Sequence, residues 1–89
     1  MNFTWNDAKR QANFEKHGLD FAEASRVFAG HTLTRPDTRV PYGESRFSTV
    51  GLLGVEVVLI AHTEAADTIH VISMRKAARH EREYYFASL

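Results

Sequence analysis

The chain contains no cysteine among its 89 residues, and this absence excludes disulfide bonds and thiolate metal sites. A long apolar run is also missing, because the longest one, Val55–Ala61, is interrupted by Glu56 and is far too short to span a bilayer. No signal-peptide pattern is present, since Asn2–Lys16 is rich in polar and charged residues. These absences fit a reducing compartment, and we expect a soluble cytoplasmic protein that makes no membrane contact.

Net charge is absent as well, because eleven Lys and Arg residues balance eleven Asp and Glu residues. Overall charge therefore gives no indication of nucleic-acid binding. The distribution is uneven, however: no Lys or Arg lies between Phe47 and Met74, and four lie between Arg75 and Arg82. Since a local cluster of charge sets the local potential even in a neutral chain, this distribution predicts a basic patch towards the C-terminal end.

Motifs for metal, nucleotide and triad chemistry are missing too. The five histidines form no H-x-x-x-H or H-E-x-x-H pair, and His62 and His70, the nearest pair in strand-like sequence, need not face the same side. No glycine-rich phosphate loop and no nucleophile elbow occurs. We therefore expect no metal, no cofactor and no triad-type hydrolase.

The first third of the sequence predicts one short strand followed by two helices. Phe3–Trp5 has the composition of a strand. We expect Asp7 to cap a helix that runs to His17, where Gly18 supplies a left-handed end. Asp20 is expected to cap a second helix, whose apolar face consists of Phe21, Ala24, Val27 and Phe28.

The rest of the chain predicts a sheet and a last helix. Leu33 indicates a short strand that Arg35-Pro36-Asp37 breaks. Gly54 and Ala65-Ala66-Asp67 provide the connections of a meander of three β-rich segments: Arg46–Leu53, Val55–Thr63 and Thr68–Met74. A helix over Ala77–Phe86 completes the order β-α-α-β-β-β-β-α. We predict a single α+β domain, in which an antiparallel β-sheet meander packs with two N-terminal helices and one C-terminal helix.

The last helix separates into two arcs when its residues are placed at intervals of about 100°. Arg75, Arg79 and Arg82 form one narrow stripe. Such a stripe is either a solvated surface or a set of phosphate ligands, since guanidinium groups match phosphate oxygens bidentately. Glu81 lies in a different, apolar arc, where a carboxylate needs a partner, and Arg46 is the predicted one. Glu81 is therefore either half of a structural ion pair or a general acid or base with a shifted pKa.

The first helix also carries a polar face, on which residues recur at helical spacing: Lys9, Asn13, Lys16 and His17. The simpler interpretation is an exposed polar surface. If the face opens towards Arg75, it supplies further phosphate ligands and an imidazole that can carry a proton near neutral pH.

Three blocks of sequence resemble the BrnT family, in the family's order and over about Phe3 to Tyr85: FTWNDAKRQANFEKHGLDFAEASRVF, YGESRF and TEAADTIHVISMRKAARHEREYY. The resemblance implies a RelE-like fold and a type II toxin, a metal-independent ribonuclease that cleaves RNA and arrests translation. It also implies a cognate ribbon-helix-helix antitoxin of the BrnA type, which neutralises the toxin and binds DNA. The toxin would then contact DNA only through its antitoxin.

The family's motif residues fall on these positions: Lys9, Asn13, Lys16, His17, Gly18, Glu44, Arg46, Glu64, Arg75, Arg79, Glu81 and Tyr85. We interpret Gly18 as a helix end. For in-line attack of the ribose 2′-oxygen on the adjacent phosphate, the predicted catalytic residues are Arg75, Arg79, His17 and Glu81. The predicted RNA-binding residues are Lys9, Lys16, Asn13, Arg82 and Tyr85, the last by stacking on a base unless it packs in the core. Supporting roles are predicted for Glu44, Arg46 and Glu64. Glu44 and Arg46 are expected to fix the geometry of the junction between the sheet and the last helix.

Four positions depart from the family pattern: His62, Ala65, His70 and His80. His62 stands where relatives commonly have Tyr, and the other three stand where a basic residue is common. At His70 and His80 a permanent positive charge is thus replaced by an imidazole that titrates, and at Ala65 the charge is lost. This difference motivates the hypothesis that RNA affinity rises as the pH falls through the histidine range.

Two other functions remain open on sequence alone. One is a non-catalytic module whose basic surface binds an antitoxin or an RNA, and RNA binding without cleaved ends would favour it. The other is a co-repressor that stabilises an antitoxin on DNA. A short ribbon-helix-helix reading frame beside the gene would support the toxin interpretations.

Overall fold

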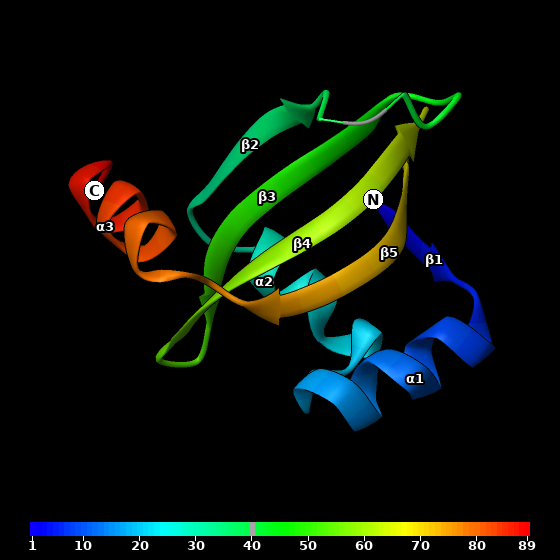
Figure 1. Cartoon of the computed structure of the whole chain (residues 1–89), viewed down its shortest axis with the longest axis horizontal. Coiled ribbons are helices and arrows are strands. Elements are labelled where there is room, and N and C mark those ends of the chain that lie inside the picture. Colours follow the sequence, from blue (N-terminus) through cyan, green and yellow to red (C-terminus); the bar gives the residue numbers. More distant parts are fainter. Residues whose placement is uncertain (40) are drawn as a thin grey trace.

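The predicted α+β order of elements is confirmed by the computed structural model, which describes residues 1–39 and 41–89 (Figure 1). A 3₁₀ turn, Phe21–Glu23, leads into the second helix. Within the described residues, no helix is both long and apolar enough to cross a bilayer. The element bounds are β1 (Asn2–Trp5), α1 (Asp7–His17), α2 (Ala24–Phe28), β2 (Thr32–Asp37), β3 (Arg46–Leu53), β4 (Glu56–Ala65), β5 (Thr68–Lys76) and α3 (Arg79–Ala87).

The cap of α1 is Asn6, so the expectation that Asp7 caps this helix is wrong by one position. The Asn6 side chain accepts a hydrogen bond from the backbone N–H of Lys9 at 3.0 Å, and Asp7 is the first helical residue. A carboxylate in the first turn still interacts favourably with the helix dipole. At the other end Gly18 has a φ of 70°, which is the predicted left-handed helix end.

The five strands form one mixed sheet in the order β1-β5-β4-β3-β2 (Figure 1). The pairs β2–β3, β3–β4 and β4–β5 are antiparallel, which confirms the predicted meander. Strand β1 joins the edge of the sheet parallel to β5, with Phe3 opposite Ile69. Parallel neighbours cannot be joined by a tight turn, and here the helices and the rest of the sheet separate them in sequence.

Strand β2 continues through Arg35-Pro36-Asp37, so the predicted break at these residues is wrong. Pro36 lies opposite Phe47 in the ladder between β2 and β3. Because β2 is at the edge of the sheet, a residue without an N–H is tolerated there. The alternation of a strand then directs Leu33, Arg35 and Asp37 to the same face of the sheet.

A register shift between β4 and β5 decides which way the end of β5 faces. The segment Val71–Ser73 lies opposite only Ala61 and His62, so Ile72 has no partner. One extra residue reverses the alternation of side chains along the strand. Arg75 therefore points to the face opposite that of Val71, although an unbroken strand would give both residues the same face.

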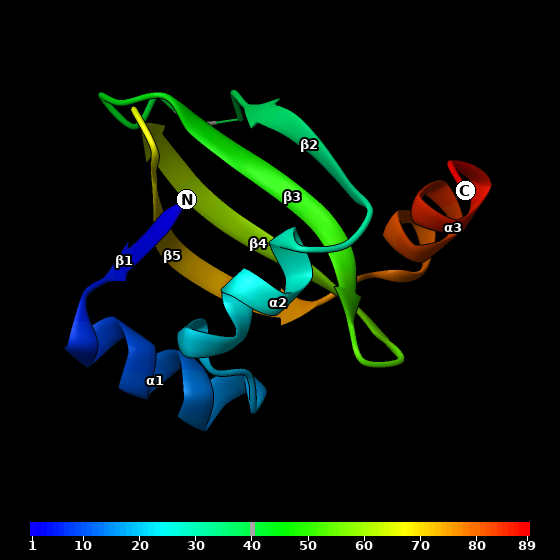
Figure 2. The same cartoon turned by 180° about the vertical axis from the view of Figure 1, so that it is seen from behind.

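The two faces of the sheet differ in how far they are covered. Helices α1 and α2 cover one of them, here called the core face (Figure 2). Its buried cluster comprises Leu19, Phe21, Ala24, Val27, Val58, Ile60, Ile69, Val71 and Met74. The other face, here called the open face, receives only α3 at one end, over a smaller cluster of Val50, Val57, Ala77 and Tyr85 (Figure 1).

Helix α3 is attached to the rest of the molecule through Tyr85. The Tyr85 side chain is buried, and its hydroxyl donates to the backbone carbonyl of His31 at 2.8 Å. The hydroxyl of Ser88 lies 3.1 Å from Nε2 of His31, which ties the end of the helix to the same residue. Of the two interpretations of Tyr85, core packing is therefore the one that the structure supports.

Candidate functional site

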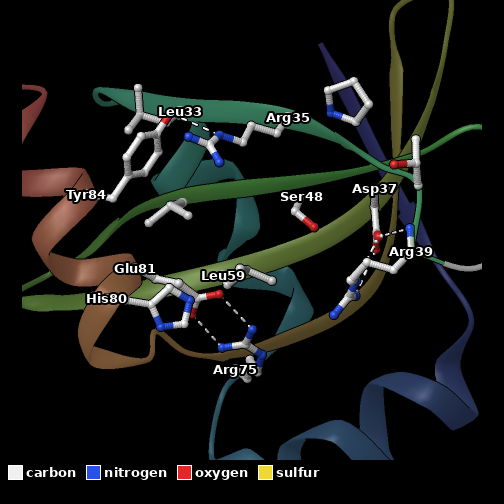
Figure 3. A pocket seen from close by; sticks show the side chains of 13 residues that line it. Leu33, Arg35, Asp37, Arg39, Ser48, Leu59, Arg75, His80, Glu81 and Tyr84 are labelled. Atoms are coloured by element: carbon white, nitrogen blue, oxygen red, sulfur yellow. Dashed lines mark hydrogen bonds and ion pairs between the residues drawn. The ribbon is translucent and has the colours of Figure 1, made fainter.

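A cleft of about 490 Å³ lies on the open face, between the sheet and the start of α3 (Figure 3). Its apolar lining residues are Leu33, Pro36, Val50 and Leu59. Its polar lining residues are Arg35, Asp37, Thr38, Arg39, Ser48, Arg75, His80, Glu81 and Tyr84. Side chains from four strands and one helix therefore converge on one concave site.

The register of the sheet creates an apolar floor in this cleft. Leu33 is opposite Val50, Val50 is opposite Leu59, and Leu59 is opposite Arg75. Directly opposed residues point to the same face, so the three apolar side chains form a continuous row that ends at the Arg75 guanidinium. The next row along β2 begins with Arg35, which sets a second guanidinium beside the apolar floor.

Glu81 holds Arg75 in a bidentate ion pair. Nη1 and Nη2 of Arg75 donate to Oε1 and Oε2 of Glu81 at 2.8 and 2.9 Å. The backbone N–H of Ala78 also donates to Glu81, at 2.7 Å, so the same carboxylate fixes the start of α3. The predicted Arg46–Glu81 pair does not form, because Arg46 donates to Glu44 at 3.1 Å.

This ion pair moves both pKa values away from neutral pH. The bond from Arg75 lowers the pKa of Glu81, and the bond to Glu81 raises the pKa of Arg75. The Glu81 side chain is only 15% exposed, so it is largely withdrawn from solvent and directed at its partner. A carboxyl group with a lowered pKa is a poor general acid, which favours the structural interpretation of Glu81.

Arg39 enters the cleft just after the end of β2. Its Nε and Nη2 donate to the Asp37 carboxylate at 2.9 and 3.0 Å, which raises the pKa of Arg39 and lowers that of Asp37. The pKa of Arg75 is set chiefly by Glu81, but the charge of Arg39 acts in the opposite direction. Two guanidinium groups that repel each other across one cleft create a favourable place for an anion.

Arg35 and Tyr84 form the third paired unit of the cleft. Nε of Arg35 donates to the Tyr84 hydroxyl at 3.0 Å, and Cζ of Arg35 lies 4.0 Å from the centre of the Tyr84 ring. The guanidinium is thus placed over the ring by a cation–π contact as well as by a hydrogen bond. Tyr84 remains 41% exposed, so an aromatic surface stays accessible at the wall of the cleft.

The cleft carries more positive than negative charge. Among its lining residues three arginines exceed two carboxylates by one charge, in a chain whose net charge is zero. His80 adds an imidazole beside Glu81 and Arg75, on the side of the cleft opposite Arg39 (Figure 3). Across residues 1–39 and 41–89, no group of three His, Cys, Asp or Glu side chains is placed to hold a metal ion. The cleft is therefore suited to a ligand that combines a phosphate with a planar, apolar part.

The predicted polar face of α1 lies on the other side of the sheet. Asn13 is buried, with Nδ2 donating to the carbonyls of Leu19 and Met74 at 3.2 and 3.0 Å and Oδ1 accepting from the Met74 N–H at 3.1 Å. These bonds fix α1 to β5 and leave Asn13 no access to a ligand. Met74 belongs to the core face, whereas Arg75 belongs to the open face. The structure therefore does not bring Arg75 together with Lys9, Lys16 or His17.

The other predicted residues of α3 lie outside the lining of the cleft. Arg79 is 85% exposed and pairs with Glu83 at 3.0 Å. Nη1 of Arg82 donates to the carbonyl of Ala77 at 2.9 Å, which stabilises the turn before the helix. Of the arginine stripe predicted from sequence, only Arg75 enters the cleft.

The predicted supporting residues lie at or near strand ends. Arg46, the first residue of β3, pairs with Glu44 in the preceding connection, and Cζ of Arg46 lies 3.9 Å from the centre of the Tyr42 ring in the same connection. The sheet-to-helix junction, which these two were predicted to fix, is fixed by Arg75 and Glu81 instead. Glu64 is exposed near the end of β4.

The histidines that depart from the family pattern lie in different surroundings. His62 is buried on the core face, where its Nε2 lies 2.7 Å from the Thr49 hydroxyl and burial lowers its pKa. Nδ1 of His70 lies 2.9 Å from the Thr4 hydroxyl, beside the edge strand β1. Of these three histidines only His80 lines the cleft, so the hypothesis of tighter RNA binding at low pH rests on that residue.

Sequence reasoning missed Arg35, Arg39 and Tyr84 as site residues. Charged and apolar residues alternate in Arg35-Pro36-Asp37, a pattern typical of a strand. Pro36 indicated a break instead, so Arg35 was not placed in the sheet. Tyr84 follows Glu81 by three residues, a spacing that puts both side chains on one side of a helix. That spacing could have placed Tyr84 beside the cleft once Glu81 was known to face it.

Fold and cleft together define a small α+β protein with a cleft of net positive charge on the open face of its sheet. Residues 5–81 match the model of a protein family described as the ribonuclease toxin, BrnT, of type II toxin-antitoxin systems. The chain belongs to this BrnT family of ribonuclease toxins, and membership implies an antitoxin partner. Its structure is similar to the crystal structure of the Brucella abortus ribonuclease toxin, BrnT, with 28% identity and a TM-score of 0.67 over 89% of this chain and 99% of that chain. No match was found among curated proteins.

Proposed function

We propose that this chain is a metal-independent endoribonuclease that cuts RNA in the open-face cleft, within a single toxin domain formed by residues 1–89. The observation that carries this proposal is the convergence of Arg35, Arg39, Arg75 and His80 on one apolar floor. Phosphoryl transfer needs positioning and charge stabilisation more than a strong nucleophile. Guanidinium groups supply that charge stabilisation without a metal ion.

Arg75 and Arg39 hold the scissile phosphate between them. Both line the cleft, and their mutual repulsion is relieved when a phosphate takes the space between their guanidinium groups. Glu81 acts as a positioning residue, because its two oxygens fix the plane of the Arg75 guanidinium. Of the catalytic residues predicted from sequence, this assignment retains Arg75. It changes the role of Glu81 from proton transfer to positioning.

The reaction is the in-line attack of the ribose 2′-oxygen on the adjacent phosphorus. A bond from the 2′-oxygen to phosphorus forms and the bond from phosphorus to the 5′-oxygen breaks, which leaves a 2′,3′-cyclic phosphate and a 5′-hydroxyl. The 2′-hydroxyl loses a proton and the departing 5′-oxygen gains one. His80 is the imidazole that lines the cleft, and it takes the proton-transfer role that sequence gave to His17. DNA lacks the 2′-hydroxyl and is not cut.

The biological consequence of this activity is the arrest of translation through loss of RNA in the cytoplasm. The partner is a ribbon-helix-helix antitoxin of the BrnA type that neutralises the toxin and provides the only contact with DNA. Membership of a type II toxin family supports the existence of an antitoxin. A short ribbon-helix-helix reading frame beside the gene, whose product copurifies with the toxin and suppresses RNA cleavage, is the expected finding.

The principal test compares Arg75→Ala with Arg79→Ala in an RNA-cleavage assay that contains EDTA. Removal of a group that stabilises developing charge lowers the rate about 10²- to 10³-fold, so Arg75→Ala should lose nearly all cleavage. Arg79 is on the same helix but outside the cleft, and its variant should cut RNA like the wild type. His80→Gln should also lose cleavage, whereas His70→Gln should retain it.

Three results would contradict the proposal. A folded Arg75→Ala protein that still cuts RNA would remove Arg75 from the reaction. Loss of wild-type activity in EDTA would contradict the metal-independent mechanism. RNA binding by the wild type with no cleaved ends would favour the non-catalytic module instead.

A further inference from the structure

The apolar floor and the Arg35–Tyr84 pair are not explained by phosphate binding. Leu33 and Leu59 are only partly buried although they line a charged cleft, and Val50 lies between them. The Tyr84 ring is 41% exposed and rises beside this floor with the Arg35 guanidinium over it (Figure 3). A phosphate gains nothing from such a surface, so a different part of the ligand must use it.

A nucleobase fits the chemistry of this surface. Single-stranded RNA is bound by stacking its unpaired bases on aromatic side chains and on the planes of arginine guanidinium groups. Arg35 and Tyr84 present both kinds of surface, and the apolar floor excludes water beneath them. Within the described residues the Arg35 guanidinium donates through Nε to the Tyr84 hydroxyl, and its terminal nitrogens are left as donors for a base edge.

This surface adjoins the phosphate site. The row Leu33–Val50–Leu59 ends at Arg75, so an apolar surface and a phosphate-binding guanidinium are consecutive along the sheet. The cleft volume of about 490 Å³ is at the small end of ligand sites and suits a single nucleotide better than a paired duplex. A base that is paired within a duplex cannot reach such a floor.

We propose that Arg35, Tyr84 and the apolar floor bind one unpaired RNA base next to the scissile phosphate. This proposal rests on the proposed function, because it places the base in relation to the phosphate held by Arg75. It makes Arg35 and Tyr84 the residues that restrict cleavage to single-stranded RNA and that influence which sequences are cut.

The experiment measures the energetic coupling between Tyr84 and the base. Short RNA oligonucleotides carry one cleavable site, with either a normal base or an abasic ribose next to the scissile phosphate. Loss of the base should lower the kcat/KM of the wild-type protein about 10- to 100-fold, which is the usual effect of losing one stacked base. Tyr84→Leu should already have lost this contribution, so the abasic substitution should have little further effect on it.

Two controls separate this role from a structural one. Phe86→Leu removes another exposed aromatic ring from α3, outside the cleft lining, and should behave like the wild type. Arg35→Gln removes the guanidinium plane that lies over the Tyr84 ring and should reduce the sensitivity to the base as Tyr84→Leu does. Because Tyr84 is partly exposed, circular dichroism should show that Tyr84→Leu folds normally.

Affinity for a non-cleavable RNA keeps the test independent of catalysis. The same oligonucleotides with a 2′-deoxyribose at the attacking position should bind the wild type more tightly with the base than without it. If the wild type cuts no RNA but shows this difference, the proposed function fails and the base site stands. If the wild type cuts RNA, Arg75→Ala does not, and the abasic effect is equal in the wild type and Tyr84→Leu, the base site is refuted and the proposed function stands.

Discussion

The two faces of the sheet contain polar groups that serve different ends. On the core face, Asn13 of α1 uses its amide to bind the backbone of Leu19 and of Met74 in β5. His62 is buried with its Nε2 2.7 Å from the Thr49 hydroxyl, whereas its Nδ1 has no hydrogen-bond partner within the described residues. On the open face, Arg35, Arg39 and Arg75 are paired but remain at the wall of a cleft. Polar groups withdrawn from water stabilise the fold only when they are satisfied, whereas those at a cleft remain available to a ligand.

This division follows from how the helices are distributed. The core face is covered by α1 and α2, whereas the open face receives only α3, which is held by Tyr85 and by the Arg75–Glu81 pair. Stability and ligand binding are thus assigned to opposite sides of the same strands. Substitutions on one face should therefore change the free energy of unfolding, and substitutions on the other should change RNA cleavage.

The largest expected contrast is between two aromatic residues, Phe21 and Tyr84. Phe21 is fully buried in the core-face cluster, so Phe21→Ala should lower the free energy of unfolding by about 3–5 kcal/mol. Tyr84→Ala removes a partly exposed ring and should lower it by about 1 kcal/mol or less. Urea denaturation of both variants measures the difference. Equal losses would mean that the open face contributes as much to stability as the core face.

A smaller but still large effect is expected at Asn13. Asn13→Ala leaves the buried N–H and carbonyl of Met74 without these partners, which should cost roughly 2–3 kcal/mol of stability. Gln11→Ala on the same helix removes only an exposed bond to Glu15 and should change stability by less than about 0.5 kcal/mol. Thermal unfolding followed by circular dichroism compares the two. A stable Asn13→Ala protein with weakened RNA binding would instead restore the role predicted from sequence.

A moderate, pH-dependent effect is expected at His62. Burial lowers the pKa of His62, with the charge of Glu64 acting in the opposite direction, so folding favours the neutral imidazole. Its contribution to stability is therefore present above the ordinary histidine pKa of about 6.5 and is lost as the pH falls below that value towards the folded pKa. His62→Gln should unfold with a weaker dependence on pH between about 7 and 5. An unchanged dependence in His62→Gln would refute the assignment.

The smallest effect is expected for Arg79→Ala. Arg79 is exposed and paired only with Glu83 on the surface of α3, and such pairs contribute about 0.5 kcal/mol or less. Neither stability nor RNA cleavage should change beyond that. A loss of cleavage comparable to that of Arg75→Ala would show that the substrate extends along α3, as the arginine stripe in the sequence predicted.

Local patterns were sufficient for most of the fold. Gly18 ends α1 in the left-handed conformation, and the meander from β3 to β5 follows the apolar segments and their turn residues. Pro36 misled the prediction of β2, because a proline is compatible with a strand only at an edge, and the sequence does not state which strand is at the edge.

The candidate site was predicted less completely. The family motif contained Arg75 and Glu81, which the structure pairs. The motif also contained the polar face of α1, which lies on the core face of the sheet, away from the cleft. Arg35 and Arg39 belong to the site only because β2 lies beside β3 at the right register. Pairing between strands depends on contacts that are distant in sequence, so spacing within one segment does not reveal it.

The sequence by itself determined the order of elements, the basic C-terminal segment and the family, because these depend on local patterns along the chain. Tertiary structure decided which residues form the cleft. The unpaired Ile72 reverses the alternation of β5 and turns Arg75 from the core face to the open face, where Glu81 and the apolar floor meet it. A single extra residue in one strand has no signature in composition or periodicity, and it is defined only by the register of the neighbouring strand.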